Sequence, residues 1–328
     1  MKILLIKLSS LGDIIHTLPA LSLLREAFPN ARIDWVTEEL PATLLSGHPY
    51  IDKVFVYKRY VWPDYLKTGK WFKLLNETRA FFKDIKNGYD IILDFQGLLK
   101  SGIITALTKG KRKIGFEGKE FNYLFLKEKV STNYNDHAIL RYLKLVEHLG
   151  IPIRHIDFPL SYNHRKWDFP KPFVAINPLA RWQSKLWFRE KWVALAKALN
   201  KLGYKVVFTG NINDSIYISD VCKNIPDAVN LSGRTPLKEL ASLYKQANLV
   251  ISVDTGTMHL AAAVGTPVIA LFGPTAPWRT GPFGKQHKVI YHGLFCQPCF
   301  KKKCPTRLCL KTIKVEEVMA AVEEISSQ

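Results

Sequence analysis

Acidic, hydroxyl and glycine residues follow the first apolar run of the chain, Lys2–Leu8, in the segment SSLGD. The carboxylate of Asp13 could act as a general base toward a hydroxyl group if it faces a cleft at the edge of a sheet. Capping of the following helix is the alternative role for this residue. Ser9 and Ser10 could donate to an anion, and Gly12 permits the tight turn that brings backbone amides close to it.

Basic side chains follow a second apolar run, Phe173–Asn177, in the segment PLARWQSKLW. Arg181 and Lys185 would lie at the mouth of a cleft and would suit a diphosphate, because both are strong donors with permanent positive charge. Either one alone could equally be a solvated charge on a loop.

A third loop, DTGTMH, begins directly after the apolar run Leu249–Val253 and leads into a helix rich in small residues. Backbone N–H groups at the start of such a helix form a natural cradle for a diphosphate. The histidine one turn into the helix would face the same phosphates, although a lone histidine on a helix is usually structural. The candidate residues of this loop are Asp254, Thr255, Gly256, Thr257 and His259.

Four cysteines near the C-terminal end follow the pattern C-x2-C-x4-C-x4-C. In a cytosolic chain, clustered cysteines indicate metal ligands before disulfides, so a zinc site is one interpretation. A loop with buried or free thiols is the other, because the spacing is looser than that of paired zinc knuckles. The residues concerned are Cys296, Cys299, Cys304 and Cys309.

Two common nucleotide-binding motifs are missing from the sequence. Neither GxGxxG nor GxxxxGK[ST] occurs, so the sequence does not favour a dinucleotide-dependent dehydrogenase or a P-loop enzyme.

Composition indicates a soluble globular protein with anionic partners. The chain is 47% hydrophobic and 23% charged, and no apolar run reaches the ~20 residues that a membrane-spanning helix needs. A net charge of +19 favours nucleic acid, an acidic membrane face or phosphorylated small molecules. The charge is spread over both halves without a basic tail, which weakens the nucleic-acid interpretation. The opening MKILLIKL lacks a cleavage site and predicts a first strand, so we expect a cytoplasmic protein.

Short apolar runs alternate with helical patterns in the first half of the chain. Predicted strands are Lys2–Leu8, Arg32–Thr37, Lys53–Tyr57, Tyr89–Asp94 and Lys113–Gly115. Predicted helices are Asp13–Phe28, Trp71–Ile85 and His137–Leu149, and we expect the apolar stripe of Trp71–Ile85 to face the core.

The alternation stops at the proline-rich stretch 150–172, a predicted linker, and then restarts. Predicted strands of the second half are Phe173–Asn177, Lys205–Thr209, Ala228–Leu231, Leu249–Val253 and Pro267–Phe272. Predicted helices are Arg189–Leu202, Ile212–Lys223, Pro236–Gln246, Thr257–Val264 and Val315–Ile325. We expect the last helix to pack back on the first half.

This alternation predicts an α/β chain of two Rossmann-like domains, residues 1–160 and 161–328, with parallel sheets facing a central cleft. Ligands bind beyond the carboxyl ends of the strands in such sheets, which is where all three loops fall.

The chain resembles glycosyltransferase family nine, which holds the ADP-heptose lipopolysaccharide heptosyltransferases. The resemblance runs from Met1 to about Val318. It rests on the segments SSLGDIIHTLPAL, DFQGLLKSG, SKLWFREKW, SVDTGTMHLAAAVGTPVIALFGPT and the cysteine loop, in that order. The first two look most like heptosyltransferase I, which adds the first heptose to Kdo-modified lipid A.

The resemblance implies a GT-B fold and an inverting transfer from ADP-heptose, with no required metal or other cofactor. It also implies an acceptor-binding first domain and a donor-binding second domain. Matched by position, Asp13 is the catalytic base, and Lys185 and the Asp254–His259 loop bind the donor diphosphate. Asp214 falls on the ribose contact. Basic residues that would meet the carboxylates and phosphates of the acceptor are Lys7, Lys58, Arg59 and Lys119.

We therefore predict a heptosyltransferase that acts on Kdo-lipid A at the inner face of the cytoplasmic membrane, to which it binds peripherally. We expect a monomer without a nucleic-acid partner. Two alternatives remain at this point: a family member that adds a later core heptose or a different sugar, and a non-catalytic nucleotide-binding protein on the same fold. Keeping both Asp13 and Lys185 argues against the second, because a binding module has no use for a base opposite a phosphate clamp.

Overall fold

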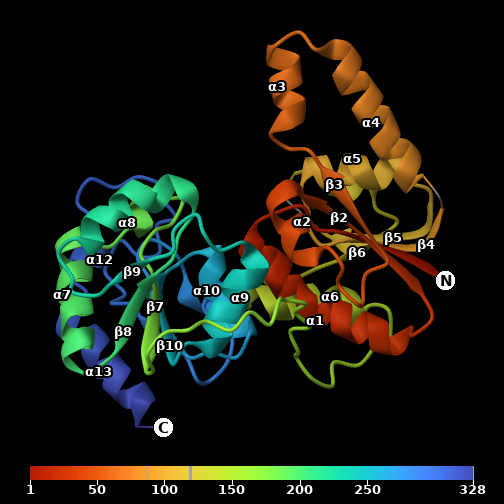
Figure 1. Cartoon of the computed structure of the whole chain (residues 1–328). Coiled ribbons are helices and arrows are strands. Elements are labelled where there is room, and N and C mark those ends of the chain that lie inside the picture. The colour runs from red at the N-terminus through yellow and green to blue at the C-terminus, as the bar shows by residue number, and fades with distance from the viewer. Residues whose placement is uncertain (87, 118–119, 328) are drawn as a thin grey trace. The chain divides into compact units, whose positions relative to one another are not determined.

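The computed structural model describes residues 1–86, 88–117 and 120–327. The chain divides into two compact units, Met1–Ser161 and a second unit from Tyr162 to the C-terminal end (Figure 1). Residues 151–170, on either side of this division, have no regular secondary structure. Each unit has its own sheet and core and is described by itself.

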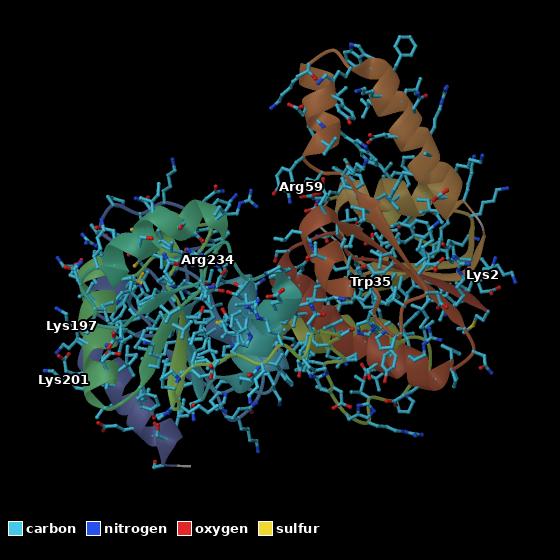
Figure 2. The ribbon with its side chains drawn as sticks, in the orientation of Figure 1. Lys2, Trp35, Arg59, Lys197, Lys201 and Arg234 are labelled. Atoms are coloured by element: carbon cyan, nitrogen blue, oxygen red, sulfur yellow. The ribbon has the colours of Figure 1, made fainter. Side chains whose placement is uncertain are left out.

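The first unit is built on a six-stranded parallel sheet in the order β3-β2-β1-β4-β5-β6. Its central strands are buried because helices cover both faces, which is why they are almost continuously apolar in sequence. Trp35 of β2, labelled in Figure 2, is fully buried, and its indole N–H donates to the Lys7 carbonyl at 3.2 Å. The strands are β1 (Lys2–Ile6), β2 (Arg32–Glu38), β3 (Lys53–Tyr57), β4 (Tyr89–Asp94), β5 (Gly110–Phe116) and β6 (Glu128–Val130).

The helices of the first unit follow its strands in turn, and α1 packs against α6. The pair α3 and α4 projects from the sheet as a helical hairpin (Figure 1). The helices are α1 (Leu11–Ala27), α2 (Glu39–Leu45), α3 (Val61–Lys67), α4 (Trp71–Ile85), α5 (Leu99–Leu107), the 3-10 turn η1 (Asn122–Phe125) and α6 (Ala138–Glu147).

The second unit repeats this topology in a parallel sheet of order β12-β11-β10-β7-β8-β9. Counted from its own first strand, the order is the same as in the first unit. The strands are β7 (Phe173–Asn177), β8 (Lys205–Phe208), β9 (Val229–Asn230), β10 (Leu249–Val253), β11 (Val268–Leu271) and β12 (Lys288–Ile290). The helices and 3-10 turns are η2 (Gln183–Lys185), α7 (Arg189–Lys201), η3 (Ile212–Asp214), α8 (Ser215–Cys222), α9 (Leu237–Gln246), α10 (Gly256–Ala263), α11 (Pro277–Thr280), α12 (Leu308–Lys311) and α13 (Val315–Ser326).

The packing of two helices can be compared with the sequence prediction. The last helix, α13, belongs to the second unit and packs on α7, where Val318 and Val322 join the core around Trp192. This apolar face of α13 therefore helps to close the second core, and packing on the first half stays a prediction. The stripe of α4 is only partly core: Phe81 and Ile85 are buried at its C-terminal end, whereas the N-terminal end of the helix is exposed.

Candidate active site

Each sheet reverses its strand order once, and the predicted functional loops leave the sheets at these points. In the first unit β1 and β4 are neighbours whose connections run in opposite directions, and in the second unit β7 and β10 are the corresponding pair. The loops that follow such strands form the usual ligand crevice of an open α/β sheet. Asp13 follows β1, Lys185 follows β7 and Asp254 follows β10.

Asp13 lies in the first turn of α1 and uses its two carboxylate oxygens differently. Oδ2 accepts hydrogen bonds from the backbone N–H and the hydroxyl of Ser10, at 2.9 and 2.8 Å, which forms a capping box. Oδ1 accepts from the Tyr142 hydroxyl at 2.8 Å. The side chain stays partly exposed. The capping role is therefore present in the structure, and one oxygen remains outside it.

The buried side chain of Lys7 forms a hydrogen bond with Tyr142. Its Nζ donates to the Tyr142 hydroxyl oxygen at 2.8 Å and to the Phe95 carbonyl at 3.0 Å. The residue is 3% exposed, so it does not lie on a surface that an acceptor could reach. The sequence prediction that Lys7 contacts the acceptor does not fit this geometry, because burial commits its ammonium group to the chain Lys7–Tyr142–Asp13.

Charge and burial act against each other on this chain. Burial by itself would raise the pKa of the Asp13 carboxyl, but the Lys7 charge, with help from His16, Ser10 and Tyr142, brings that pKa below its ordinary range. Burial, followed by the charge on Asp13, raises the pKa of Tyr142 well above 10, so its hydroxyl keeps its proton and donates. Asp13 is thus held as a carboxylate at neutral pH.

The motif DFQGLLKSG holds the Asp13 loop in place. Gln96, directly after β4, accepts hydrogen bonds through Oε1 from the backbone N–H groups of Leu8 and Ser9, at 3.0 and 3.1 Å. Asp94 is buried and accepts from the Gln96 and Gly97 amides. This motif therefore acts by positioning the neighbouring loop.

Basic residues also gather at the carboxyl ends of β2 and β3. Glu38 is buried and pairs with Arg59 at 3.0 Å and with Lys100 at 2.6 Å. Lys58 instead pairs with Glu77 of α4 at 3.1 Å. Arg59 and Lys100 thus share one carboxylate, while Lys58 belongs to the base of the α3–α4 hairpin. Lys119 lies outside the described residues.

In the second unit, Lys185 and Asp254 form a well-shielded ion pair with an Nζ–Oδ2 distance of 2.6 Å. Thr275 donates to the same carboxylate oxygen at 2.5 Å. The Lys185 ammonium group also lies 4.7 Å from the centre of the Trp182 ring. The structure therefore brings together the loops after β7, β10 and β11 around one lysine.

The start of α10 lies beside this ion pair in sequence. Thr255 is the residue before the helix, and the hydroxyl oxygen of Thr257 accepts from the Asn177 side-chain amide at 2.7 Å. Thr255, Gly256 and Thr257 are partly exposed, whereas His259 is buried. Backbone amides at this end of a helix favour an anion.

Two further predicted residues of this unit differ in exposure. Arg181 is exposed on the loop before η2. Asp214 is partly exposed, and its Oδ2 accepts from the backbone N–H of Asn211 at 2.9 Å within its own turn. Partial burial raises the pKa of Asp214. Its Oδ1 takes no part in that turn.

The cysteine-bearing loop packs against the Lys185 loop. Ser184 donates through its hydroxyl to the Lys301 carbonyl at 2.5 Å, and Arg307 donates to the Leu186 carbonyl at 2.9 Å. Among the described residues, no group of three or more His, Cys, Asp or Glu side chains is placed to hold a metal ion. The zinc interpretation of the four cysteines is therefore unsupported by this geometry, and the loop contributes by bracing Lys185.

Within the described part of the chain, none of the helices combines the length and the apolar character needed to cross a bilayer.

Comparison with known proteins decides the family. The model of the family described as glycosyltransferase family 9 (heptosyltransferase) matches residues 78–309. The chain belongs to glycosyltransferase family 9. The matched range contains Gln96 of the first unit and Lys185 and Asp254 of the second, whereas Asp13 precedes it.

Its relatives cover nearly the whole chain. Lipopolysaccharide heptosyltransferase 1 of Salmonella typhimurium is 30% identical over 299 residues, which are 87% of this chain and 92% of the relative. The protein of the same name from Pseudomonas aeruginosa is 29% identical over 93% of this chain and 87% of its own length. Lipopolysaccharide heptosyltransferase 3 of Escherichia coli K12 is 27% identical over 96% of this chain and 95% of its own length.

Solved structures agree with this assignment. Escherichia coli heptosyltransferase WaaC with ADP matches with a TM-score of 0.84 at 26% identity, over 99% of this chain and 100% of WaaC. Escherichia coli ADP-heptose lps heptosyltransferase II matches with a TM-score of 0.76 at 22% identity, over 99% of this chain and 98% of its own. This family 9 glycosyltransferase therefore has the GT-B fold, as the resemblance implied.

Sequence reasoning missed three residues that the structure adds to the candidate site of the transferase. Tyr142 was treated only as part of a helix, and nothing local marks it, because it meets Asp13 across 129 positions. Gln96 and Lys100 lie inside the recognised segment DFQGLLKSG. Their position after a central strand was the signal that could have singled them out.

Proposed function

We propose that this chain transfers heptose from ADP-heptose to a Kdo residue of the lipopolysaccharide inner core, with Kdo-lipid A as the acceptor. Three kinds of similarity support the proposal. The family is that of heptosyltransferases, several relatives are named lipopolysaccharide heptosyltransferase 1, and the matching WaaC structures hold ADP or ADP-2-deoxy-2-fluoro heptose.

The second unit supplies the donor site in this proposal. Lys185 is already fixed by Asp254 and Trp182, so it meets the diphosphate without having to be ordered first. The amides of Gly256 and Thr257 lie at the start of α10, where the helix dipole favours the negative charge that grows on the leaving ADP. Arg181 and Asp214 are proposed as further contacts to phosphate and ribose.

The first unit supplies the base. An acceptor hydroxyl must lose its proton as it attacks the anomeric carbon, and Asp13 accepts that proton. The observation that carries this step is the chain Lys7–Tyr142–Asp13, which keeps Asp13 ionised and orients Oδ1. Attack on the face opposite the departing diphosphate inverts the configuration of the sugar. Arg59 and Lys100 are proposed to meet the anionic groups of the acceptor.

The test is a reconstitution with purified protein, ADP-heptose and Kdo-lipid A. We expect ADP release and a product heavier by one heptose in equal amounts. ADP release without product would indicate hydrolysis of the donor, and neither signal would exclude this donor and acceptor pair.

A second candidate is transfer of a later core heptose, and the similarity to heptosyltransferase 3 favours it. The same assay with a Kdo-lipid A that already carries its first heptose separates the two. Higher kcat/KM on the heptosylated acceptor would move the chain to the later step.

A further inference from the structure

The α3–α4 hairpin carries large apolar side chains that are exposed to solvent and do not belong to the core. Trp71 is 61% exposed and Phe72 is 84% exposed, both in the first turn of α4. Leu66 at the end of α3 and Leu75 one turn further along α4 are also exposed. In a helix Trp71 and Leu75 lie one above the other, and all four residues lie near the turn that joins α3 to α4. We call this surface, Leu66, Trp71, Phe72 and Leu75, the hairpin tip.

The base of the hairpin is firmly packed, so the exposure of the tip is not a sign of a loose segment. The rings of Tyr57, Trp62 and Phe81 meet edge to face, with centroids 4.9 to 6.2 Å apart. Glu77 of α4 accepts hydrogen bonds from the side chains of Lys58, Trp62 and Tyr65, at 3.1 to 3.2 Å. The tip is thus held away from the sheet on a fixed support (Figure 1).

The turn between the helices is equally well defined. Gly69 has φ of +68°, a conformation that an L side chain rarely adopts, and the Lys70 amide donates to the Tyr65 carbonyl at 2.9 Å. This turn sets the ends of α3 and α4 beside each other at the tip.

The charge around the tip is positive. Between residues 60 and 76 the sequence holds Lys67, Lys70 and Lys73 and a single acid before the tip, Asp64. All three lysines are exposed, and none forms an ion pair with a described carboxylate. Aromatic and leucine side chains flanked by lysines are the combination that binds at the interface of an anionic bilayer.

We propose that the hairpin tip docks this enzyme on the surface of an anionic phospholipid bilayer. Trp71, Phe72 and Leu75 enter the headgroup region, and the three lysines meet lipid phosphates. The inference rests on the proposed function in one respect: an acceptor anchored by lipid requires the enzyme to work at a membrane. The hairpin starts directly after Arg59, so docking would hold the carboxyl edge of the first sheet about the length of α3 away from the headgroups.

The experiment is sedimentation of the full chain with sucrose-loaded vesicles that contain no acceptor. One set is phosphatidylcholine alone and the other holds roughly one-third phosphatidylglycerol. We expect clear binding to the anionic set and weak binding to the neutral set. Replacing Lys67, Lys70 and Lys73 by Gln should lower partitioning to anionic vesicles about fivefold per lysine. Trp71→Ser with Phe72→Ser should lower it at least about tenfold.

Matched controls come from the second unit. Lys197 and Lys201 are exposed on α7 (Figure 2), and together with Lys223 they allow a triple Gln variant with the same change in net charge. Leu202→Ser with Phe295→Ser removes two other exposed apolar side chains. Both control variants should bind vesicles like the original chain. An equal loss of binding in test and control variants would overturn the proposal, because binding would then follow overall charge.

Heptose transfer to an acyl-free, water-soluble acceptor separates this inference from the proposed function. That activity should be the same in all variants. Transfer without vesicle binding by the original chain would overturn the docking proposal and leave the function standing. Vesicle binding without transfer would contradict the proposed function and leave the docking proposal standing. Self-association by light scattering that the Trp71 and Phe72 changes abolish, with no vesicle binding, would show that the tip is a protein interface instead.

Discussion

Asp13 serves its own helix with one oxygen and, in the proposed reaction, the acceptor with the other. Ser10 occupies Oδ2 through two donors, and Tyr142 reaches Oδ1. Asn has one oxygen and an NH₂ group, so Asp13→Asn must turn a donor toward either Ser10 or Tyr142. We expect it to lower the free energy of unfolding by about 1–3 kcal/mol. Turnover should fall by about 10²–10⁴-fold, because the amide cannot accept a proton. Urea denaturation and steady-state kinetics measure the two effects.

Tyr142→Phe is the matched control for this variant. It removes one hydrogen bond to Asp13 but leaves the carboxylate, so it should keep turnover within about tenfold while also lowering stability. Near-normal turnover in folded Asp13→Asn protein would reduce Asp13 to its capping role.

Asp94 should give the first unit a pH-dependent stability. Burial raises the pKa of its carboxyl to about 6, although Gly97, Ser101 and Gln96 donate to it. The pKa in the unfolded chain is about 4, so protonation favours the folded state. The stabilisation is complete below pH ~4 and is lost as the pH rises through 6, a change of roughly 2–3 kcal/mol. Asp94→Asn lacks this titration.

The measurement is urea denaturation of both proteins between pH 4 and 7. The stability of the original chain relative to Asp94→Asn should fall across this range. A difference that stays constant with pH would mean that Asp94 titrates alike in both states.

At the residue scale, the sequence predicts the site residues that directly follow a strand. It does not predict the partners that contact them from distant parts of the chain. The positions of Asp13, Lys185 and Asp254 follow from apolar runs that stop at a polar loop. Lys7 was assigned to the acceptor by its position in the family resemblance, but its side chain is buried. The burial of Lys7 and its hydrogen bond to Tyr142 depend on how α6 packs on α1. No local sequence pattern predicts that packing.

At the element scale, the carboxyl edge of the first sheet separates two neighbouring cations. Arg59 shares Glu38 with Lys100, whereas Lys58 pairs with Glu77 in the hairpin base. Arg59→Ala should therefore raise the KM for the acceptor by about 10-fold or more, the usual scale for a lost charge-assisted hydrogen bond. Lys58→Ala should change this KM much less. Initial rates over a range of acceptor concentrations and salt measure both.

Donor KM provides the internal check on this pair. It should be unchanged in both variants, because the proposed donor residues lie in the second unit. A loss of donor affinity in Arg59→Ala, with acceptor KM preserved, would reverse the allocation of the two units.

Strong periodicity was enough to predict most elements. The strands Lys53–Tyr57, Tyr89–Asp94, Phe173–Asn177 and Leu249–Val253 and the helix Trp71–Ile85 have the predicted bounds. The short edge strands β6 and β12 were missed, since three residues carry no readable period. The stripe of α4 was assigned to the core as a whole, yet periodicity shows only that one face is apolar. It does not show how far along that face a partner extends.

At the scale of the whole molecule, the same topology occurs twice with different side chains at the switch points. The first unit places a carboxylate there and the second a lysine. The alternation of apolar runs and helices predicted both sheets, and the prolines of 150–172 predicted the stretch between them. Sequence alone does not show which core α13 completes, because a helix that follows the last strand can pack on either one, and here Val318 and Val322 join the second.

Binding of the donor nucleotide should stabilise this molecule selectively. A ligand raises stability by RT ln(1 + [L]/Kd), which is about 2.7 kcal/mol at 100 times Kd. We expect ADP to raise the melting temperature clearly and UDP or GDP to raise it weakly, since the similar WaaC structure holds ADP. Lys185→Ala should reduce the ADP shift, and its own melting temperature should also fall because Asp254 is left buried without its partner. The melting temperature of each variant is therefore compared with and without ADP by scanning calorimetry.

If the two units melt separately, only the transition of the second unit should move with ADP, and the first unit then serves as the control within the same chain. Equal or stronger stabilisation by UDP would contradict the ADP-heptose assignment, and an ADP shift confined to the first unit would contradict the placing of the donor site.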